Sequence, residues 1–251
     1  MNRVLGVIKN ITERKQAEKI LANIETARKK EIHHRIKNNL QVISSLLDLQ
    51  AEKFRAREHF KDLEVLNAFR ESQDRVISIA LIHEELHEGK GKDTLNFSPY
   101  LHRLVENLFQ TYTLGNADIS LNMDLEENIF FDMDTAVPLG LIVNELVSNS
   151  LKYAFQGRDK GIIKIRLNRG ENGKTVSSKH ENRKEGYGST NFILTVSDNG
   201  VGISEGFSME DSDTLGTQLV TALVDQLDGK IDLKKDSGTE FIIRFSIPEK
   251  K

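Results

Sequence analysis

The first residues of this sequence that could carry chemistry stand in the run HHRIKNNLQ, from His33 to Gln41. Apolar residues around this run recur every three or four positions, which predicts one apolar stripe along a helix. At about 100° per residue, His34 projects roughly 160° from the centre of that stripe, and His33 only about 60° from it. We expect His34 to be exposed beside Glu31, one turn earlier, where an imidazole can act as a nucleophile. The alternative is an ordinary surface histidine on a helical bundle.

A second set of polar side chains lies in NELVSNSLKYAF, from Asn144 to Phe155. Glu145 and Asn149 are four positions apart, and Lys152 follows one turn later on the same side of a helix. Carboxylate and amide oxygens bind Mg²⁺ and an ammonium group binds phosphate, so this face suits a magnesium–phosphate site. Ordinary polar residues on a helix surface are the alternative.

Glycine-containing turns follow at three places. The segment SDNGVGIS, from Ser197 to Ser204, comes directly after a predicted strand. Its Asp198 can accept a hydrogen bond from an exocyclic amine, and its two glycines let the backbone approach a ligand closely. In TLGTQLV, Gly216 begins a predicted helix whose amino-terminal N–H groups could meet phosphate. Ser237–Gly238–Thr239 precedes the last predicted strand, and each of these segments taken singly also fits an ordinary turn.

The elements that must position these residues divide the chain in two. No glycine or proline occurs from Ile11 to Glu88, which predicts an almost wholly helical front part. Apolar positions from Leu21 to Leu47 and from Leu63 to Leu81 form two amphipathic series, broken around Phe54–Phe60. They predict a helical hairpin. Because a lone hairpin buries little apolar surface, we expect two copies to form a four-helix bundle.

The part of the chain after a boundary near Gly89–Asp93 reads as α/β. Helices are predicted from Ser98 to Thr113, with the serine as N-cap, and from Asp134 to Phe155. The polar stretch Asn168–Asn191 is predicted to be a loop, either an active-site lid or a solvated hairpin insertion. Short β-branched runs predict strands from Ala117 to Leu125, Ile129 to Phe131, Ile162 to Leu167, Phe192 to Ser197, Lys230 to Leu233 and Phe241 to Ile247.

Composition excludes several kinds of function. The 251 residues carry a net charge of -3, which argues against nucleic-acid binding through overall positive charge. The chain has no cysteine, so disulfides, thiol catalysis and cysteine-ligated zinc are excluded. No apolar run approaches the roughly 18 residues of a membrane span, and the amino end lacks the apolar core of a signal peptide. We expect a cytoplasmic protein that contacts neither nucleic acid nor membrane.

The order of these motifs resembles that of the sensor histidine kinases of two-component systems, over roughly Glu31 to Ile247. HHRIKNNLQ is similar to the histidine box of the subfamily that has HHRxKNNLQ in place of the commoner HExRxPL. NELVSNSLKYAF resembles the family's N box, SDNGVGIS its G1 box and LGTQLV a shortened G2 box. Near the amino end, RVLGVIKNITERKQAEK resembles the last strand and exit linker of a PAS sensor domain.

This resemblance implies an α plus α/β fold with four parts. Residues 1–11 would end a PAS domain, and residues 12–29 would form a linker helix. Residues 30–90 would form the helical hairpin for dimerisation and histidine phosphotransfer, which becomes a four-helix bundle in the dimer. Residues 94–249 would form an α/β-sandwich ATP-binding domain of the GHKL type.

Matched by position, the resemblance makes His34 the phosphoacceptor, with His33 as the runner-up. Asn149 and Glu145 would bind Mg²⁺. Glu145 stands where the family has the residue that polarises the attacking imidazole or a metal-bound water. The general base stays open between Glu31 and Glu145.

The resemblance also implies a set of nucleotide-binding residues. Lys152 would bind the phosphates, Tyr153 would pack on the base, and Asp198 would hold the adenine amine with support from Thr239. The full set is Asn149, Lys152, Tyr153, Asp198, Gly200, Gly202, Ile203, Gly216, Thr217, Leu219 and Thr239. Thr217 stands where the subfamily usually has leucine.

The implied activity is that of an ATP-dependent, autophosphorylating histidine kinase with ATP and Mg²⁺ as cofactors. The His34 ring would attack the γ-phosphorus in line, and the phosphohistidine would pass its phosphoryl group to an aspartate in the receiver domain of a response regulator. The implied assembly is a homodimer through the hairpin. Two alternatives stay open: a signalling scaffold that binds ATP without catalysis, and a serine/threonine kinase or ATPase on the same nucleotide fold.

Overall fold

The computed structural model describes residues 62–88, 94–112, 118–170, 189–204, 206–209 and 214–248, together with Gln16, Lys19 and Ile20. The chain divides into two compact units, Met1–Asp48 and Leu49–Lys251, and every helix and strand named below belongs to the second unit. The histidine box, with His33, His34 and Glu31, lies outside the described residues, as does the PAS-like strand Arg3–Asn10. The phosphoacceptor and the domain boundaries therefore stay predictions.

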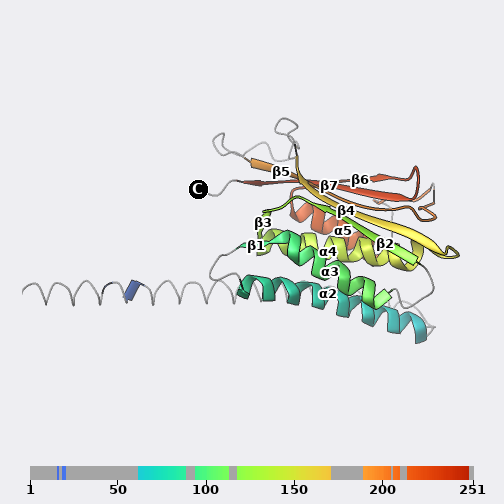
Figure 1. Ribbon diagram of the computed structural model, residues 1–251, viewed down its shortest axis with the longest axis horizontal. Helices are drawn as coiled ribbons and strands as arrows, with labels where there is room; N and C mark the ends of the chain where they lie inside the picture. Colours follow the sequence, from blue (N-terminus) through green and yellow to red (C-terminus); the bar gives the residue numbers. More distant parts are fainter. Residues whose placement is uncertain are drawn as a thin grey trace, which may run out of the picture. The chain divides into compact units, whose positions relative to one another are not determined.

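A mixed five-stranded sheet forms one layer of the described unit, in the order β2-β4-β5-β7-β6 (Figure 1). Its strands are β2 (Asp118–Leu125), β4 (Lys160–Arg169), β5 (Ser189–Asp198), β6 (Lys230–Lys234) and β7 (Thr239–Pro248). β2 lies parallel to β4, and the other neighbouring pairs are antiparallel. Buried and exposed residues alternate along β4, because one face of the sheet packs on helices and the other faces solvent. All these strands overlap the predicted ones.

Helices cover one face of this sheet: α3 (Phe97–Tyr112), α4 (Met133–Asn149) and α5 (Leu215–Gln226) (Figure 1). α4 contacts both of the others and is buried from Ala136 to Ser148. Between the helices and the sheet lies a cluster of aromatic rings with centroids 5.0 to 5.9 Å apart, formed by Phe97, Phe131, Phe192 and Phe245. These large apolar side chains supply much of the core that joins the two layers.

A short antiparallel ribbon, β1 (Thr94–Asn96) with β3 (Phe130–Asp132), leads into α3 and α4. β1 was not predicted from the sequence, because three residues are too few to show a periodic pattern. The predicted N-cap of α3, Ser98, is wrong. The helix begins at Phe97, and the Ser98 hydroxyl donates to the carbonyl oxygen of Glu126 at 3.0 Å. The Ser98 hydroxyl, which was predicted to cap the helix, therefore makes a tertiary hydrogen bond.

The long helix α2 (Asp62–Glu88) lies against α3 and α4, on the side of the helical layer away from the sheet (Figure 1). Ile79 and Ile82 are buried there, at 5% and 0% exposed. Phe69 and Val76, which belong to the apolar series that predicted the hairpin, are 66% and 43% exposed. α2 therefore has one apolar face that packs within this unit and a second that faces solvent. Among the described helices, none combines the length and the hydropathy that crossing a bilayer requires.

Candidate functional site

The N-box segment forms the end of α4 and a turn of π-helix, η1 (Ser150–Ala154), which follows directly. Asp132 caps the beginning of α4, and its carboxylate accepts a backbone N–H of the first turn at 3.1 Å. The sequence predicted one regular helix to Phe155, whereas the last turn is widened, a feature that recurs at functional sites. Asn149 and Lys152 stand on either side of this change in helix type.

Asp198, the predicted adenine-binding residue, ends β5 and is 8% exposed. Its Oδ2 accepts the hydroxyl of Ser150 at 2.8 Å, and its Oδ1 accepts the backbone N–H of Gly200 at 2.9 Å. These two donors hold the carboxylate in one orientation and leave lone pairs for a further donor. Sequence reasoning missed Ser150, although it lies inside the N box next to Asn149, because only the fold brings it to the end of β5.

The turn before the last strand lies directly behind Asp198. Thr239 pairs with Asp198 in the β5–β7 register and is buried. Gly238 has φ +109, and a Cβ there would lie 2.1 Å from the carbonyl oxygen of Asp198. No side chain fits that space, so this glycine lets the turn pack on the G1 box. Val201 of the G1 box donates its N–H to the carbonyl oxygen of Ala154 at 2.8 Å, which ties the same segment to η1.

The G2 box brings the beginning of α5 to the N box. A Cβ at Gly216 would lie 2.8 Å from Glu145 Oε2 and 3.8 Å from Asn149 Nδ2. Thr214 caps the helix: its hydroxyl accepts the N–H of Thr217 at 3.4 Å and lies 2.6 Å from the Thr217 hydroxyl. The structure therefore explains the threonine at position 217 as part of a cap. The amino-terminal turn of this helix therefore begins beside the N box, an arrangement suited to an anion.

The remaining predicted nucleotide-binding residues differ in exposure. Leu219 is buried at 8% exposed, Ile203 is half-buried, and Gly202 has φ +76 beside the carbonyl of Gly238. Tyr153 is 57% exposed, so much of its ring is open to a stacking partner. The structure thus brings the three boxes and the last turn together around one region.

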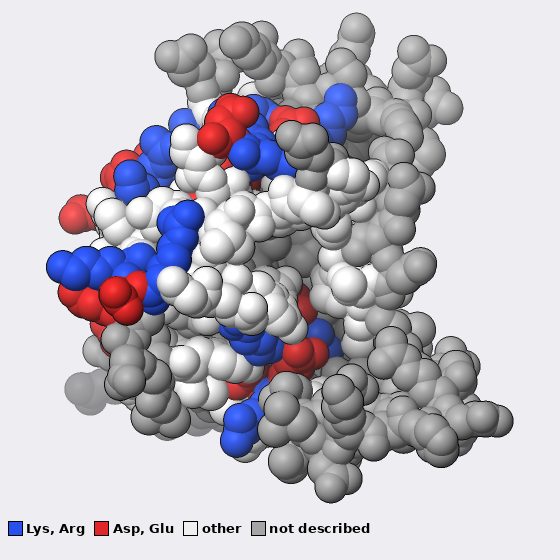
Figure 2. Space-filling view, turned by 90° about the vertical axis from the view of Figure 1, so that its right-hand side faces the viewer, with Lys and Arg blue, Asp and Glu red and all other residues white. Residues whose placement is uncertain are grey.

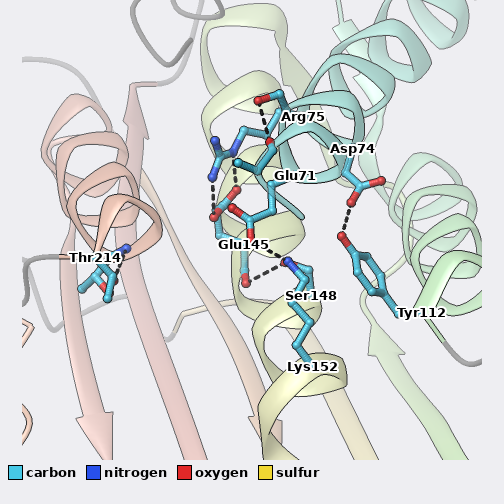
Figure 3. Close-up of polar contacts among 11 residues, drawn as sticks. Glu71, Asp74, Arg75, Tyr112, Glu145, Ser148, Lys152 and Thr214 are labelled. Carbon is cyan, nitrogen blue, oxygen red and sulfur yellow. Dashed lines mark hydrogen bonds and ion pairs between the residues drawn. The ribbon is translucent and has the colours of Figure 1, made fainter. Parts of the chain in front are cut away.

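The carboxylate of Glu145 is not free. Arg75 of α2 donates to both of its oxygens, with Nε 2.6 Å from Oε1 and Nη2 3.0 Å from Oε2 (Figure 3). The two side chains are 2% and 5% exposed, so this is a buried bidentate ion pair. Polar residues on an open helix surface, the alternative for the N box, are therefore wrong for this position, because α2 covers it.

Lys152 is also held by α2. Its Nζ lies 2.9 Å from Oε1 of Glu71 and 4.9 Å from the centre of the Tyr112 ring (Figure 3). The Tyr112 hydroxyl in turn donates to Asp74, again on α2. Sequence reasoning singled out none of these partners, because charged residues on a predicted hairpin helix look like a solvated face.

Burial and these contacts shift several pKa values. Burial raises the pKa of the Asp74 carboxyl, against the opposing effect of the Tyr112 hydrogen bond. Burial also raises the pKa of the Tyr112 phenol, and the neighbouring Asp74 charge adds to that shift. For the Arg75 guanidinium, burial acts to lower the pKa, but the hydrogen bonds and charge of Glu145 outweigh it and leave the pKa raised. The Arg75 guanidinium therefore stays charged over the whole ordinary pH range.

The donor set suits a magnesium ion that is shared with phosphates. Among the residues that the structure describes, no group of three or more acidic or histidine side chains could hold a metal on its own. Mg²⁺ is commonly bound by one or two protein oxygens together with substrate phosphates, which matches Asn149 and Glu145 beside the first turn of α5. The oxygen donors fit, although Arg75 occupies those of Glu145.

Surface charge is mixed on the face drawn in Figure 2. Lys and Arg side chains lie next to Asp and Glu there and do not gather into one positive field. Exposed pairs such as Lys234 with Glu240, 2.9 Å apart, and Arg244 with Asp232 show the same pattern on the sheet. Such pairs contribute little to stability.

Comparison with known families identifies the class of protein. The family model described as histidine kinase matches residues 31–112, and the model described as histidine kinase-, DNA gyrase B-, and HSP90-like ATPase matches residues 134–251. The chain belongs to the sensor histidine kinases and has the GHKL-type ATPase domain, which implies the use of ATP. The predicted fold class, helical segment followed by an α/β ATPase domain, is confirmed.

The curated relatives that match this chain are also histidine kinases by name. The chain is 30% identical over 245 residues to the sensor histidine kinase PdtaS of Mycobacterium tuberculosis, covering 96% of this chain and 43% of that protein. It is 27% identical over 222 residues to the blue-light-activated histidine kinase 2 of Erythrobacter litoralis, covering 87% of this chain and 56% of that protein. The chain thus spans about half the length of the curated relatives it matches.

Solved structures show the same fold. The blue-light activated histidine kinase EL346 of Erythrobacter litoralis superposes with a TM-score of 0.60 at 23% identity, covering 86% of this chain and 57% of that one. Its separate histidine kinase domain gives a TM-score of 0.57 at 22% identity, covering 84% of this chain and 85% of that one.

Proposed function

We propose that this chain is an autokinase that phosphorylates its own histidine from ATP and then transfers the phosphoryl group to a response regulator. One observation carries the proposal: the boxes converge on a single region. Gly216 of the G2 box faces Glu145 and Asn149 of the N box, and the Gly238 turn backs Asp198 of the G1 box. Each box alone fits an ordinary turn or helix, but their assembly suits one bound nucleotide.

The proposed reaction is a double phosphoryl transfer. A ring nitrogen of His34 forms a bond to the γ-phosphorus of ATP, the bond from that phosphorus to the bridging oxygen breaks, and ADP leaves. The phosphoryl group then moves from the histidine to an aspartate carboxylate of a receiver domain. Asp198 accepts a hydrogen bond from the adenine amine, and the ammonium group of Lys152 offsets the negative charge of the phosphates. The site therefore accelerates the reaction chiefly by positioning and charge neutralisation.

Asn149, with Glu145 as its neighbour one turn earlier, would hold Mg²⁺ in this proposal. The bound ion would supply neutralisation of the phosphate charge. Glu145 can bind the ion, or act as the general base in place of Glu31, only after it leaves Arg75. In this proposal, the ion pair belongs to a state in which Glu145 takes no part in phosphoryl transfer.

The proposed partners are a receiver domain and a second copy of the chain. The solvent-facing apolar side chains of α2, Phe69 and Val76, support pairing through the hairpin, because exposed large apolar residues at helical spacing mark a surface that packs. ATP as the phosphoryl donor suits a location in the cytoplasm.

The proposal is tested by incubation of the chain with ATP labelled at the γ-phosphate, followed by acid treatment of the labelled protein. We expect a label that acid removes, since phosphohistidine is acid-labile. His34→Gln should abolish the label and retain ATP binding, because the nucleotide site lies in the other family segment. His33→Gln is the matched control and should keep substantial labelling.

Three outcomes would count against parts of this proposal. Loss of label only in His33→Gln would mean that the helix phase is off by one residue. A label that survives acid in the double variant would favour a serine/threonine kinase. ATP binding without any label would favour the signalling scaffold.

A further inference from the structure

Two residues assigned to the phosphate end of the site are held by the same helix. Glu71 of α2 pairs with Lys152, and Arg75, one turn later, pairs with Glu145 (Figure 3). α2 lies within the segment matched by the histidine kinase model, residues 31–112, which also contains His34. The two partners lie within the ATPase match, residues 134–251. These ion pairs therefore join the phosphoacceptor segment of the family to its nucleotide site.

The same side chains cannot serve α2 and a triphosphate together. The Lys152 ammonium has Glu71 at 2.9 Å on one side and the Tyr112 ring on another, and it is only 15% exposed. A phosphate brought to Lys152 would stand beside the negative charge of Glu71, which like-charge repulsion disfavours. Each carboxylate oxygen of Glu145 accepts a hydrogen bond from Arg75, and the positive guanidinium charge beside these oxygens disfavours a metal ion there.

We infer that docking of the charged half of α2, which we define as Glu71, Asp74 and Arg75, competes with binding of the nucleotide triphosphate, so that this contact holds the kinase inactive until ATP displaces it. The inference rests on the proposed function, because it takes Lys152 and Glu145 as nucleotide-site residues. Competition of this kind is reciprocal: docking weakens phosphate binding by the same factor by which phosphate weakens docking.

The contact is built in a way that allows it to open. A buried ion pair contributes little net stability when both partners return to water together, because the attraction in the interior only offsets their lost hydration. Arg75 Nη1 is buried and makes no hydrogen bond to any residue that the structure describes, so this nitrogen lacks a described partner in the closed state. Ile79 and Ile82, further along α2, are buried apolar residues that can keep the helix attached. The charged half can therefore lift while the apolar half of α2, these two isoleucines, remains packed.

The first experiment measures nucleotide affinity by calorimetry with the whole chain. Glu71→Gln removes the charge that holds Lys152. Glu85→Gln is the matched control, because Glu85 also ties α2 to the next segment, through Arg103 at 2.7 Å, without touching the site. We expect Glu71→Gln to tighten ATP binding about two- to fivefold, a typical range for one ion pair, and to leave adenosine binding unchanged. Glu85→Gln should change neither, and equal ATP affinities for the two variants would overturn the inference.

The second experiment separates displacement from a simple change of local charge. Backbone hydrogen exchange along α2 is compared in the unsubstituted chain with and without Mg²⁺ and a non-hydrolysable ATP analogue. Displacement predicts faster exchange around Glu71–Arg75 and unchanged exchange around Ile79–Ile82. Equal or slower exchange around Glu71–Arg75 would show that α2 stays docked and would overturn the inference.

The design distinguishes failure of this inference from failure of the proposed function. If neither the unsubstituted chain nor Glu71→Gln binds ATP, the nucleotide site itself is wrong. If ATP binds, and Asn149→Asp abolishes that binding, but Glu71→Gln behaves like Glu85→Gln, the kinase assignment stands and only the competition with α2 is refuted.

Discussion

The two ends of the candidate nucleotide site are held in place by different kinds of contact. At the adenine end, Asp198 is oriented by Ser150 and Gly200, both from the ATPase segment itself. At the phosphate end, Glu145 and Lys152 are held by charged residues of α2, which lies in the histidine kinase segment (Figure 3). One end is thus built for recognition whatever the rest of the chain does. The other end depends on the position of α2, which lies in the segment that matches the histidine kinase family model.

This contrast has a physical reason. Hydrogen bonds to a carboxylate from a neighbouring turn hold it rigidly and keep acceptor capacity for the ligand. Ion pairs between segments consume the charges that a phosphate would need, but they separate at little net cost when both partners regain water. The two ends of the candidate site therefore differ in how readily their contacts can separate.

The largest effect is expected from breaking one side of the buried ion pair. Arg75→Met keeps most of the side-chain volume but leaves the buried Glu145 carboxylate without a partner. We expect the free energy of unfolding to fall by about 3–5 kcal/mol, the usual cost of an uncompensated buried charge, as measured by denaturant titration. Arg75→Met combined with Glu145→Gln should recover much of that loss. A loss below about 1 kcal/mol in the single variant would place this pair with ordinary surface pairs and remove the contrast.

A smaller effect, on binding, is expected at the adenine end. Asp198→Asn exchanges an acceptor for a donor that faces the adenine amine. We expect ATP affinity to fall about ten- to a hundredfold, the range for a lost hydrogen bond to a charged group, measured by calorimetry. The same substitution at Asp225, exposed on α5, is the control and should have no effect. Equal affinity of the unsubstituted chain for ATP and GTP would show that Asp198 does not read the base.

The smallest effect is expected from Tyr112→Phe, which removes the hydroxyl that donates to Asp74. We expect a loss of about 1 kcal/mol in unfolding free energy at neutral pH, because a buried carboxylate loses a donor. Burial raises the pKa of Asp74 in the folded protein, so ionisation of Asp74 costs stability as the pH rises from mildly acidic values. The deficit of the variant should therefore shrink as the pH falls and Asp74 becomes protonated. A deficit that does not change with pH would mean that the hydroxyl serves packing alone.

The amino-acid sequence by itself determined the regular elements and the motifs. The strands β4 and β7 follow from β-branched runs, and α4 was predicted to begin at Asp134, one residue after its observed start at Met133, because these signals are local. The order of the boxes was enough to place the chain among the sensor histidine kinases, which the family matches confirm. The assignment of His34 stays a prediction, since it lies outside the described residues.

The tertiary structure alone decided which side chains meet. Ser150 reaches Asp198 across 48 positions of sequence, and Arg75 reaches Glu145 across 70. No periodicity along the chain encodes such pairs, because they depend on how α4 packs against β5 and on the face that α2 presents. The same reason explains why Ser98 was wrongly predicted to be a cap. A serine near the start of a helix commonly caps a nearby backbone N–H, but in the fold the Ser98 hydroxyl donates to the distant carbonyl oxygen of Glu126. The sequence motifs were enough to select the candidate residues of the site, and tertiary packing determined which of them contact α2.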